Sequence, residues 1–162
     1  MKTFFLILAL LAGVVVMTQS GKEKTEIIIT KTTPYCGGAN PPEEILNEAR
    51  KQKIPYGEKF YIIKGGCNKI DRVIIDTLVF DSSGKRLKML KPGCYSVINE
   101  FGFNKLTTDA DKFDLVCLKA LWTKPLFSFV VVKGKSETFS HNIAEQCPYN
   151  MPCHKGIIAV PL

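Results

Sequence analysis

The segment Arg72–Ile98 constrains the fold most, because it contains three strand-like runs separated by two turn signals. Val73–Phe80 is rich in β-branched and aromatic residues, which fit a half-buried pleated surface. The four residues from Asp81 to Gly84 favour a turn, since Asp and Ser side chains bond the local backbone and Gly tolerates a positive φ. Pro92-Gly93 then separates a second short run from a third, because Pro cannot donate to a ladder. The segment therefore predicts β structure.

The same spacing resembles a known group of domains. A strand, D-x-x-G, a short strand, P-G-x-Y and a further strand resemble the carboxypeptidase regulatory-like, prealbumin-like and collagen-adhesin B-type domains. The matching residues are Asp81, Gly84, Leu90, Pro92, Gly93 and Tyr95. With PYCGGA near its start and a closing C-x5-C, the chain also resembles small secreted proteins of Bacteroidetes-type bacteria. The resemblance implies a mainly β, antiparallel sandwich of about seven strands with one or two short helices, but little about activity, because one fold hosts many functions.

Residues 1–20 have the pattern of a secretory signal peptide. Lys2 provides the positive start, and Phe4–Met17 is an unbroken apolar run, shorter than the roughly 20 residues of a membrane-spanning helix. An uncleaved anchor is the alternative. We expect residues 21–162 to form a single domain without a membrane span, which is secreted, periplasmic or at the cell surface.

The six cysteines all lie after this segment, and an even count behind a signal peptide predicts a disulfide framework. They are Cys36, Cys67, Cys94, Cys117, Cys147 and Cys153. Six cysteines allow fifteen pairings, which the sequence does not resolve. Cys67 with Cys94 is the favoured pair, because each lies beside a glycine near a strand end. A bond from Cys36 to the C-terminal pair would close a very long loop.

Metal binding is the competing interpretation of the C-terminal cysteines. Cys147, Cys153 and His154 offer two thiols and an imidazole, and His141 is close in sequence. However, zinc thiols are typically spaced C-x2-4-C, and this spacing is wider. A C-x-x-C redox motif is absent from the sequence. We therefore expect neither a metal nor another cofactor.

The remaining chain offers a few clear elements. A helix is predicted near 41–52, with Asn40 as N-cap and Pro41 at the first position. Its apolar stripe is expected to lie on a sheet or to cover one end of the domain. A short helix is predicted over Phe113–Trp122. Further strands are expected at 27–30 (as an edge), 60–63, 125–132, 138–143 and 156–161.

The sequence predicts binding rather than catalysis. It contains no G-x-S-x-G, P-loop, H-E-x-x-H or G-x-G-x-x-G motif. The net charge of +7 is scattered, without the Arg-rich run or basic helix of a nucleic-acid module. We therefore expect a secreted or periplasmic, non-enzymatic β-sandwich module that binds a protein or glycan of the cell envelope.

Two alternatives remain open. One is a small disulfide-rich interaction protein such as an inhibitor, toxin or adhesin. The other is a metal-dependent hydrolase using His141 and His154. The candidate binding residues are Tyr35, Trp122 and Tyr149, although packing in the core is the simpler role for an aromatic side chain. Phe101 and Phe103 either enter the core or form an exposed patch.

Overall fold

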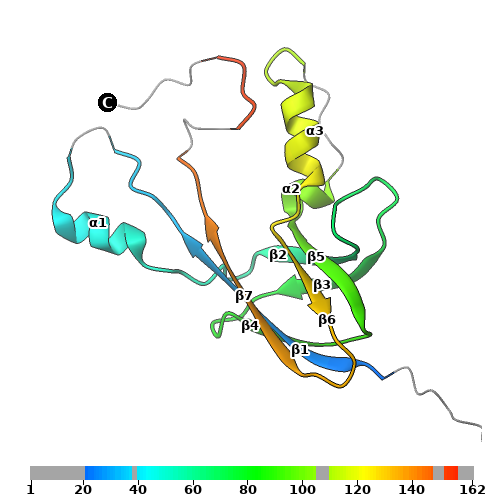
Figure 1. The fold of residues 1–162 in the computed structure, drawn as a ribbon. Helices are drawn as coiled ribbons and strands as arrows, with labels where there is room; N and C mark the ends of the chain where they lie inside the picture. The colour runs from blue at the N-terminus through cyan, green and yellow to red at the C-terminus, as the bar shows by residue number, and fades with distance from the viewer. Residues whose placement is uncertain (1–20, 38–39, 105–109, 148–151, 157–162) are drawn as a thin grey trace, which may run out of the picture.

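The computed structural model describes residues 21–37, 40–104, 110–147 and 152–156. Across these residues the chain forms seven strands and three helices. In chain order they are β1 (Glu23–Thr32), α1 (Glu43–Arg50), β2 (Lys59–Lys64), β3 (Ile74–Val79), β4 (Lys85–Leu90), β5 (Gly93–Asn99), α2 (Glu100–Phe103), α3 (Leu115–Thr123), β6 (Phe127–Val131) and β7 (Glu137–Ala144). The strands form two facing sheets, so the predicted mainly β sandwich is confirmed (Figure 1).

One sheet has the strand order β4-β1-β7 and the other has the order β3-β2-β5-β6. All neighbouring strands are antiparallel except β1 and β7, which run parallel with Thr25 opposite Glu137. The expectation that 27–30 forms an edge strand is therefore wrong, since β1 is the centre of its sheet. Its alternating Ile27 and Ile29 have an exposed fraction of zero, as a strand between two neighbours requires.

The core lies between the two sheets and takes apolar residues from six strands. Its buried members are Ile27, Ile29, Phe60, Ile62, Leu78, Phe80, Leu90, Tyr95, Val97, Phe129 and Val131. Within each strand they occupy alternate positions, because successive side chains point to opposite faces. A smaller cluster of Tyr61, Ile63 and Ile98 lies on the outer face of the four-stranded sheet, where the ring of Phe103 stacks on Tyr61 at 4.0 Å.

The predicted turn between β3 and β4 is confirmed in detail. The Asp81 carboxylate accepts hydrogen bonds from the Ser83 N–H at 2.9 Å and from the Ser83 hydroxyl, and the Gly84 N–H donates to the Asp81 carbonyl. Gly84 has a φ of 65°, in the left-handed region that glycine tolerates best. The bonds from the Ser83 hydroxyl and the Ser83 N–H, together with one from Arg86, lower the pKa of the Asp81 carboxyl group to about 2.

The first helix forms where predicted but differs in its start and its packing. Its N-cap is Pro42, which makes no side-chain cap bond, so neither Asn40 nor Pro41 has its predicted role. No residue of α1 is buried, and Ile45 is 46% exposed. The expectation that its apolar stripe lies on a sheet or covers one end is therefore wrong: α1 extends from the sheets on the β1–β2 connection (Figure 1).

The second half of the chain follows its predicted elements closely. The helix α3 and the strand β6 form at the expected residues, and Phe129 and Val131 are buried on one face of β6. The predicted strand at 156–161 lies mostly outside the described residues, as does the predicted signal peptide at 1–20.

The structure contains two disulfides, Cys36–Cys147 and Cys117–Cys153, whereas Cys67 and Cys94 are exposed free thiols. The predicted Cys67–Cys94 pair is therefore wrong. Just beyond β2, the Gly65 N–H still bonds to the Cys94 carbonyl at 3.0 Å, and the Gly65 carbonyl accepts from the Ser96 hydroxyl. By Asn68 the chain has turned toward α3, where the Asn68 N–H bonds to the Thr123 carbonyl, and Cys67 lies on this turn.

Candidate functional site

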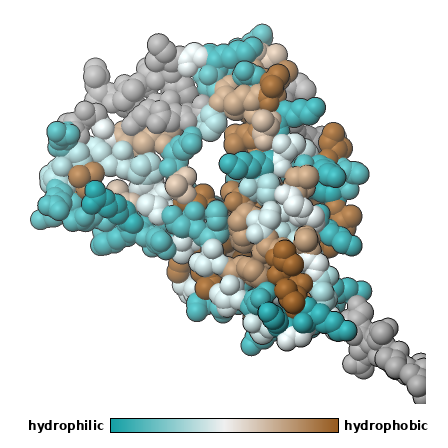
Figure 2. Space-filling model, viewed as in Figure 1, coloured by the Kyte–Doolittle hydropathy of each residue, from teal (hydrophilic) through white to brown (hydrophobic). Residues whose placement is uncertain are grey.

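A cleft of about 650 Å³ opens between β7 and the helical end of the molecule. It is called here the α3–β7 cleft. The space-filling view shows the molecule hollowed between the end of β7 and α3 (Figure 2). The wall formed by α2, α3 and the link to β6 contributes Phe101, Leu118, Leu121, Lys124, Pro125 and Leu126, and the opposite wall is β7 from His141 to Ala144.

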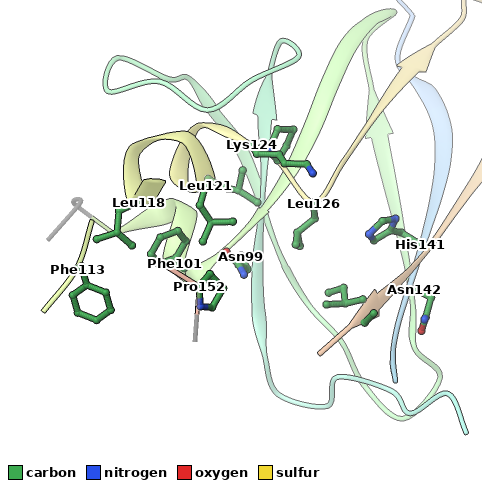
Figure 3. Close-up of a pocket in the computed structure, with 14 residues that line it drawn as sticks. Asn99, Phe101, Phe113, Leu118, Leu121, Lys124, Leu126, His141, Asn142 and Pro152 are labelled. Carbon is green, nitrogen blue, oxygen red and sulfur yellow. The ribbon is translucent and has the colours of Figure 1, made fainter. Parts of the chain in front are cut away.

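The helical wall begins with a tight packing of α2 against β5. The Asn99 side chain caps α2 by accepting from the Gly102 N–H at 3.1 Å. A Cβ atom on Gly102 would come within 3.1 Å of the Ile98 Cβ atom and 3.4 Å of the Asn68 amide nitrogen. Only glycine fits this approach without displacing a neighbour, and the approach brings Phe101 to the cleft (Figure 3).

The rest of this wall is α3, which is fixed at its start. The Asp114 carboxylate caps α3 by accepting from the Val116 and Cys117 N–H groups at 2.9 and 3.1 Å. The Cys117–Cys153 disulfide ties this first turn to the C-terminal segment, whose Pro152 also lines the cleft. Leu118 and Leu121 then project from α3 toward the opening (Figure 3).

The opposite wall depends on the parallel pairing of β7 with β1. This pairing sets His141 opposite Ile29, which belongs to the buried face of β1. Beyond the strands, the Glu145 N–H donates to the Thr32 carbonyl at 2.9 Å, and the Cys36–Cys147 disulfide follows. The end of β7 is therefore fixed beside the end of β1.

His141 is the only imidazole lining the cleft among the described residues. Its ring stacks on Phe127 with 4.9 Å between ring centroids. Burial lowers the pKa of His141 below its usual value of 6.5, because desolvation disfavours the charged ring. At neutral pH the cleft therefore presents an uncharged imidazole, with one nitrogen that donates and one that accepts.

The other polar groups of the cleft are few. Lys124 contributes an ammonium at the rim, and Asn99 and Asn142 contribute amides. The Asn142 oxygen already accepts from the hydroxyls of Thr30 and Thr32 at 3.0 and 3.1 Å. A mostly apolar cleft with a few fixed polar groups can bind an apolar group and orient it by one or two hydrogen bonds.

The three aromatic residues proposed from the sequence do not meet in this cleft. Tyr35 is half-buried near the Cys36–Cys147 disulfide, where its carbonyl contacts the Cys147 sulfur. Trp122 is buried, donates from Nε1 to the Asn104 carbonyl at 2.9 Å, and lines a different pocket. Tyr149 lies outside the described residues.

The two histidines also have separate environments. His154 packs edge-on against Phe113 at 5.4 Å and is not part of the cleft lining. Cys147 and Cys153 are both used in disulfides, with different partners, so they do not form the zinc pair that was considered. Over the described ranges, no three side chains of His, Cys, Asp or Glu are grouped so as to hold a metal ion.

Sequence reasoning missed Lys124 and Leu126 as site residues. Both lie in the short link between α3 and β6, and the Leu126 N–H extends the β5–β6 ladder by bonding to the Val97 carbonyl at 2.9 Å. The Lys-Pro-Leu sequence could have indicated both residues, because a short link between a helix and a buried strand places its side chains at the end of the sheet. Phe101, left open between core and surface, is 41% exposed and lines the cleft.

None of the helices in the described part of the chain is long and apolar enough to cross a bilayer. Comparisons with models of protein families, with curated proteins and with solved structures found no match for this chain.

Proposed function

We propose that the protein is a secreted or periplasmic, non-enzymatic binding module, and that the α3–β7 cleft is its binding site. The observation that carries this proposal is the composition of the cleft, in which apolar side chains from α2, α3, β7 and the link to β6 surround one neutral imidazole. The ligand expected there is an apolar group of an envelope protein or glycolipid. The two disulfides support an oxidising compartment, where such bonds persist.

The surroundings of His141 favour binding over acid–base catalysis. A general base usually needs a partner that orients its ring, such as a carboxylate within hydrogen-bond reach. Within the described residues, the His141 ring contacts Phe127 and makes no hydrogen bond to a side chain. Among the described residues that line the cleft, none is Asp or Glu.

A neutral fluorescent probe tests the cleft directly. N-phenyl-1-naphthylamine should gain fluorescence with the folded wild-type protein, because its quantum yield rises in an apolar site. Leu121→Lys places a charge in the cleft and should abolish most of this gain. Leu115→Lys is the matched control, since Leu115 lies on the same helix, is 36% exposed against 38% for Leu121, and does not line the cleft. Equal loss with both variants would contradict the proposal.

Export is tested separately. The full chain, expressed with residues 1–20 in a Gram-negative host, should be recovered outside the cytoplasm with two disulfides per molecule. Deleting residues 2–20 should retain the protein in the cytoplasm. Recovery of the intact chain in the cytoplasm, with all six thiols reactive toward an alkylating reagent, would overturn the proposed compartment.

A further inference from the structure

A second pocket, of about 610 Å³, lies on the other side of α3 and is unrelated to the α3–β7 cleft. It is called here the Arg72 pocket. Its lining comes from the β2–β3 loop, the start of β3, the end of α2 and α3. Ile70, Ile74 and Phe103 supply the apolar surface, and Ile70 is 94% exposed. A side chain this apolar and this exposed is available to a ligand.

The Arg72 guanidinium is held in this pocket by contacts with two aromatic rings and two backbone carbonyl groups. Its guanidinium carbon lies 5.6 Å from the Phe103 ring centroid and 5.4 Å from the Trp122 ring centroid, which are cation–π distances. Its Nη1 donates to the Lys69 carbonyl at 3.2 Å, and its Nη2 donates to the Phe103 carbonyl. Because these contacts are formed on folding, binding an anion here costs little further side-chain entropy.

Within the described residues, the ionised side chains that line the pocket are all cationic. They are Arg72 and Lys119, and neither contacts a carboxylate of the described residues. The Arg72 Nε is buried and has no acceptor. A partly buried guanidinium is normally paired, since desolvating a charge without a partner is costly. The described part of the pocket therefore has no counter-anion, and an anionic ligand would supply one.

Two kinds of acidic ligand fit the surroundings poorly. An extended peptide would add to the free edge of β3, but the Thr77 and Val79 carbonyls on that edge already accept from Lys88 and Arg86. An acidic sugar would need an open aromatic face and several hydrogen-bond partners. The Trp122 ring is buried and covered by Arg72, and Asn104 is the one neutral amide side chain among the described lining residues.

We propose that the Arg72 pocket binds an aliphatic carboxylate, of the class of medium-chain fatty acids. The carboxylate would lie between the guanidinium of Arg72 and the ammonium of Lys119. The acyl chain would lie along Ile70, Ile74 and the edge of the Phe103 ring. A carboxylate accepts charge-assisted hydrogen bonds from both cations, and the chain covers apolar surface that is otherwise in water.

Trp122, the only tryptophan of the chain, provides the measurement. Decanoate, kept below its micellar concentration, is titrated into the full-length mature protein while tryptophan emission is recorded. We expect saturable binding that weakens as NaCl is raised, because salt screens exposed charges. 1-Decanol has the same chain without the charge and should bind at least about fivefold more weakly.

The variants locate the site. Lys119→Ala should weaken decanoate binding about two- to fivefold, as expected for a partly exposed charge contact, and Lys119→Glu should weaken it further. Lys133→Ala removes the same charge from an exposed position elsewhere and should change nothing. Arg72→Lys keeps the charge but loses the planar fork, so it should also weaken binding.

Three outcomes would overturn the proposal: decanol binding as tightly as decanoate, identical affinities of Lys119→Ala and Lys133→Ala, or no saturable change in emission. Leu121→Lys should leave decanoate affinity unchanged, because Leu121 lines the other cleft. A failure here would therefore not affect the function proposed for the α3–β7 cleft.

Discussion

Lys31 joins three separate segments through its side chain. It lies on β1, 20% exposed, with Nζ at 2.7 Å from carboxylate oxygens of both Glu58 and Glu145. Lys31→Met keeps the length of the side chain but removes the charge and both pairs. We expect a loss of about 1–2 kcal/mol in the free energy of unfolding, above the value of an ordinary surface pair. Urea denaturation measures it, and Lys51→Met, which breaks the exposed Glu48–Lys51 pair, should show no measurable change.

The same cluster predicts a pH dependence. Burial lowers the pKa of Lys31, but the hydrogen bonds to Glu145 and Glu58 outweigh it, so the net shift is upward from 10.5. The Lys31 hydrogen bond lowers the pKa of Glu145 from 4.5. The stabilisation is therefore complete between these values and is lost as pH falls through the folded pKa of Glu145 or rises through that of Lys31. The difference between wild type and Lys31→Met should be constant from about pH 6 to 9 and should shrink below about pH 4.5. A difference unchanged at pH 3 would exclude this role of the cluster.

His141 predicts a second pH effect, at the cleft. Its pKa is lowered from 6.5 by burial, so the unfolded chain binds the proton more readily than the folded protein. Stability should therefore decrease as pH falls from above 6.5 through the folded pKa, and His141→Gln should remove this contribution. Proton NMR titration of the imidazole resonance gives the folded pKa, with His154→Gln used to assign the two signals. A folded pKa above 6.5 would contradict the burial of the ring.

At the scale of the elements, α3 depends on its cap. The Asp114 carboxylate satisfies two N–H groups of the first turn, which would otherwise have no intrahelical acceptor. Asp114→Ala should cost about 1 kcal/mol of unfolding free energy. Asp114→Asn keeps an acceptor oxygen at the same place and should cost clearly less. Thermal or urea unfolding of both variants gives the comparison, and equal losses would show that the cap bond is not the source of the effect.

The strands were predictable because their signal is local. The β-branched and aromatic content of Val73–Phe80 and the alternation in Phe127–Val131 are both read from neighbouring residues, and the buried residues of β6 follow the alternation. The position of a strand in its sheet is not local. Ile27 and Ile29 look the same in an edge strand and in a central strand, and β1 becomes central only because β7, more than 100 residues later, pairs beside it. The amphipathic pattern of α1 likewise does not specify what it packs against.

At the scale of the whole molecule, the cleft and the disulfides are products of this long-range pairing. Both walls of the α3–β7 cleft consist of residues that the sequence marks only as apolar, and nothing local indicates that Leu121 and Ile143 face the same space. His141 was recognised as a chemically useful residue, but the sequence placed it with His154 rather than beside Phe127. The predicted Cys67–Cys94 pair was wrong for a related reason: a glycine beside each cysteine near a strand end is a local signal, and it does not specify which cysteines the fold brings together.

The Cys36–Cys147 disulfide joins the chain just beyond the ends of β1 and β7, two strands that pair in parallel although a long stretch of sequence separates them. It spans 111 residues of sequence, whereas Cys117–Cys153 spans 36. In the chain-entropy model the two bonds contribute roughly 5 and roughly 4 kcal/mol at 25 °C, a difference of about 1 kcal/mol. Double alanine variants of each pair, made in a background with Cys67→Ser and Cys94→Ser to prevent exchange, should therefore lose stability in that order.

The Cys36–Cys147 disulfide also predicts an effect that is confined to the paired strands β1 and β7. Without Cys36–Cys147, the residue after β7 is still held by the Glu145–Thr32 backbone bond, by the Lys31–Glu145 ion pair and by the Thr33 hydroxyl, which donates to the Glu145 carboxylate. Hydrogen exchange of the β7 amides should accelerate in that variant, and naphthylamine binding in the cleft should weaken, because β7 forms one wall. Removing Cys117–Cys153 should instead accelerate exchange in α3. If β7 stayed fully protected in the first variant while global stability fell, the bond would act only on the unfolded chain, and the cleft would be shaped by the sandwich itself.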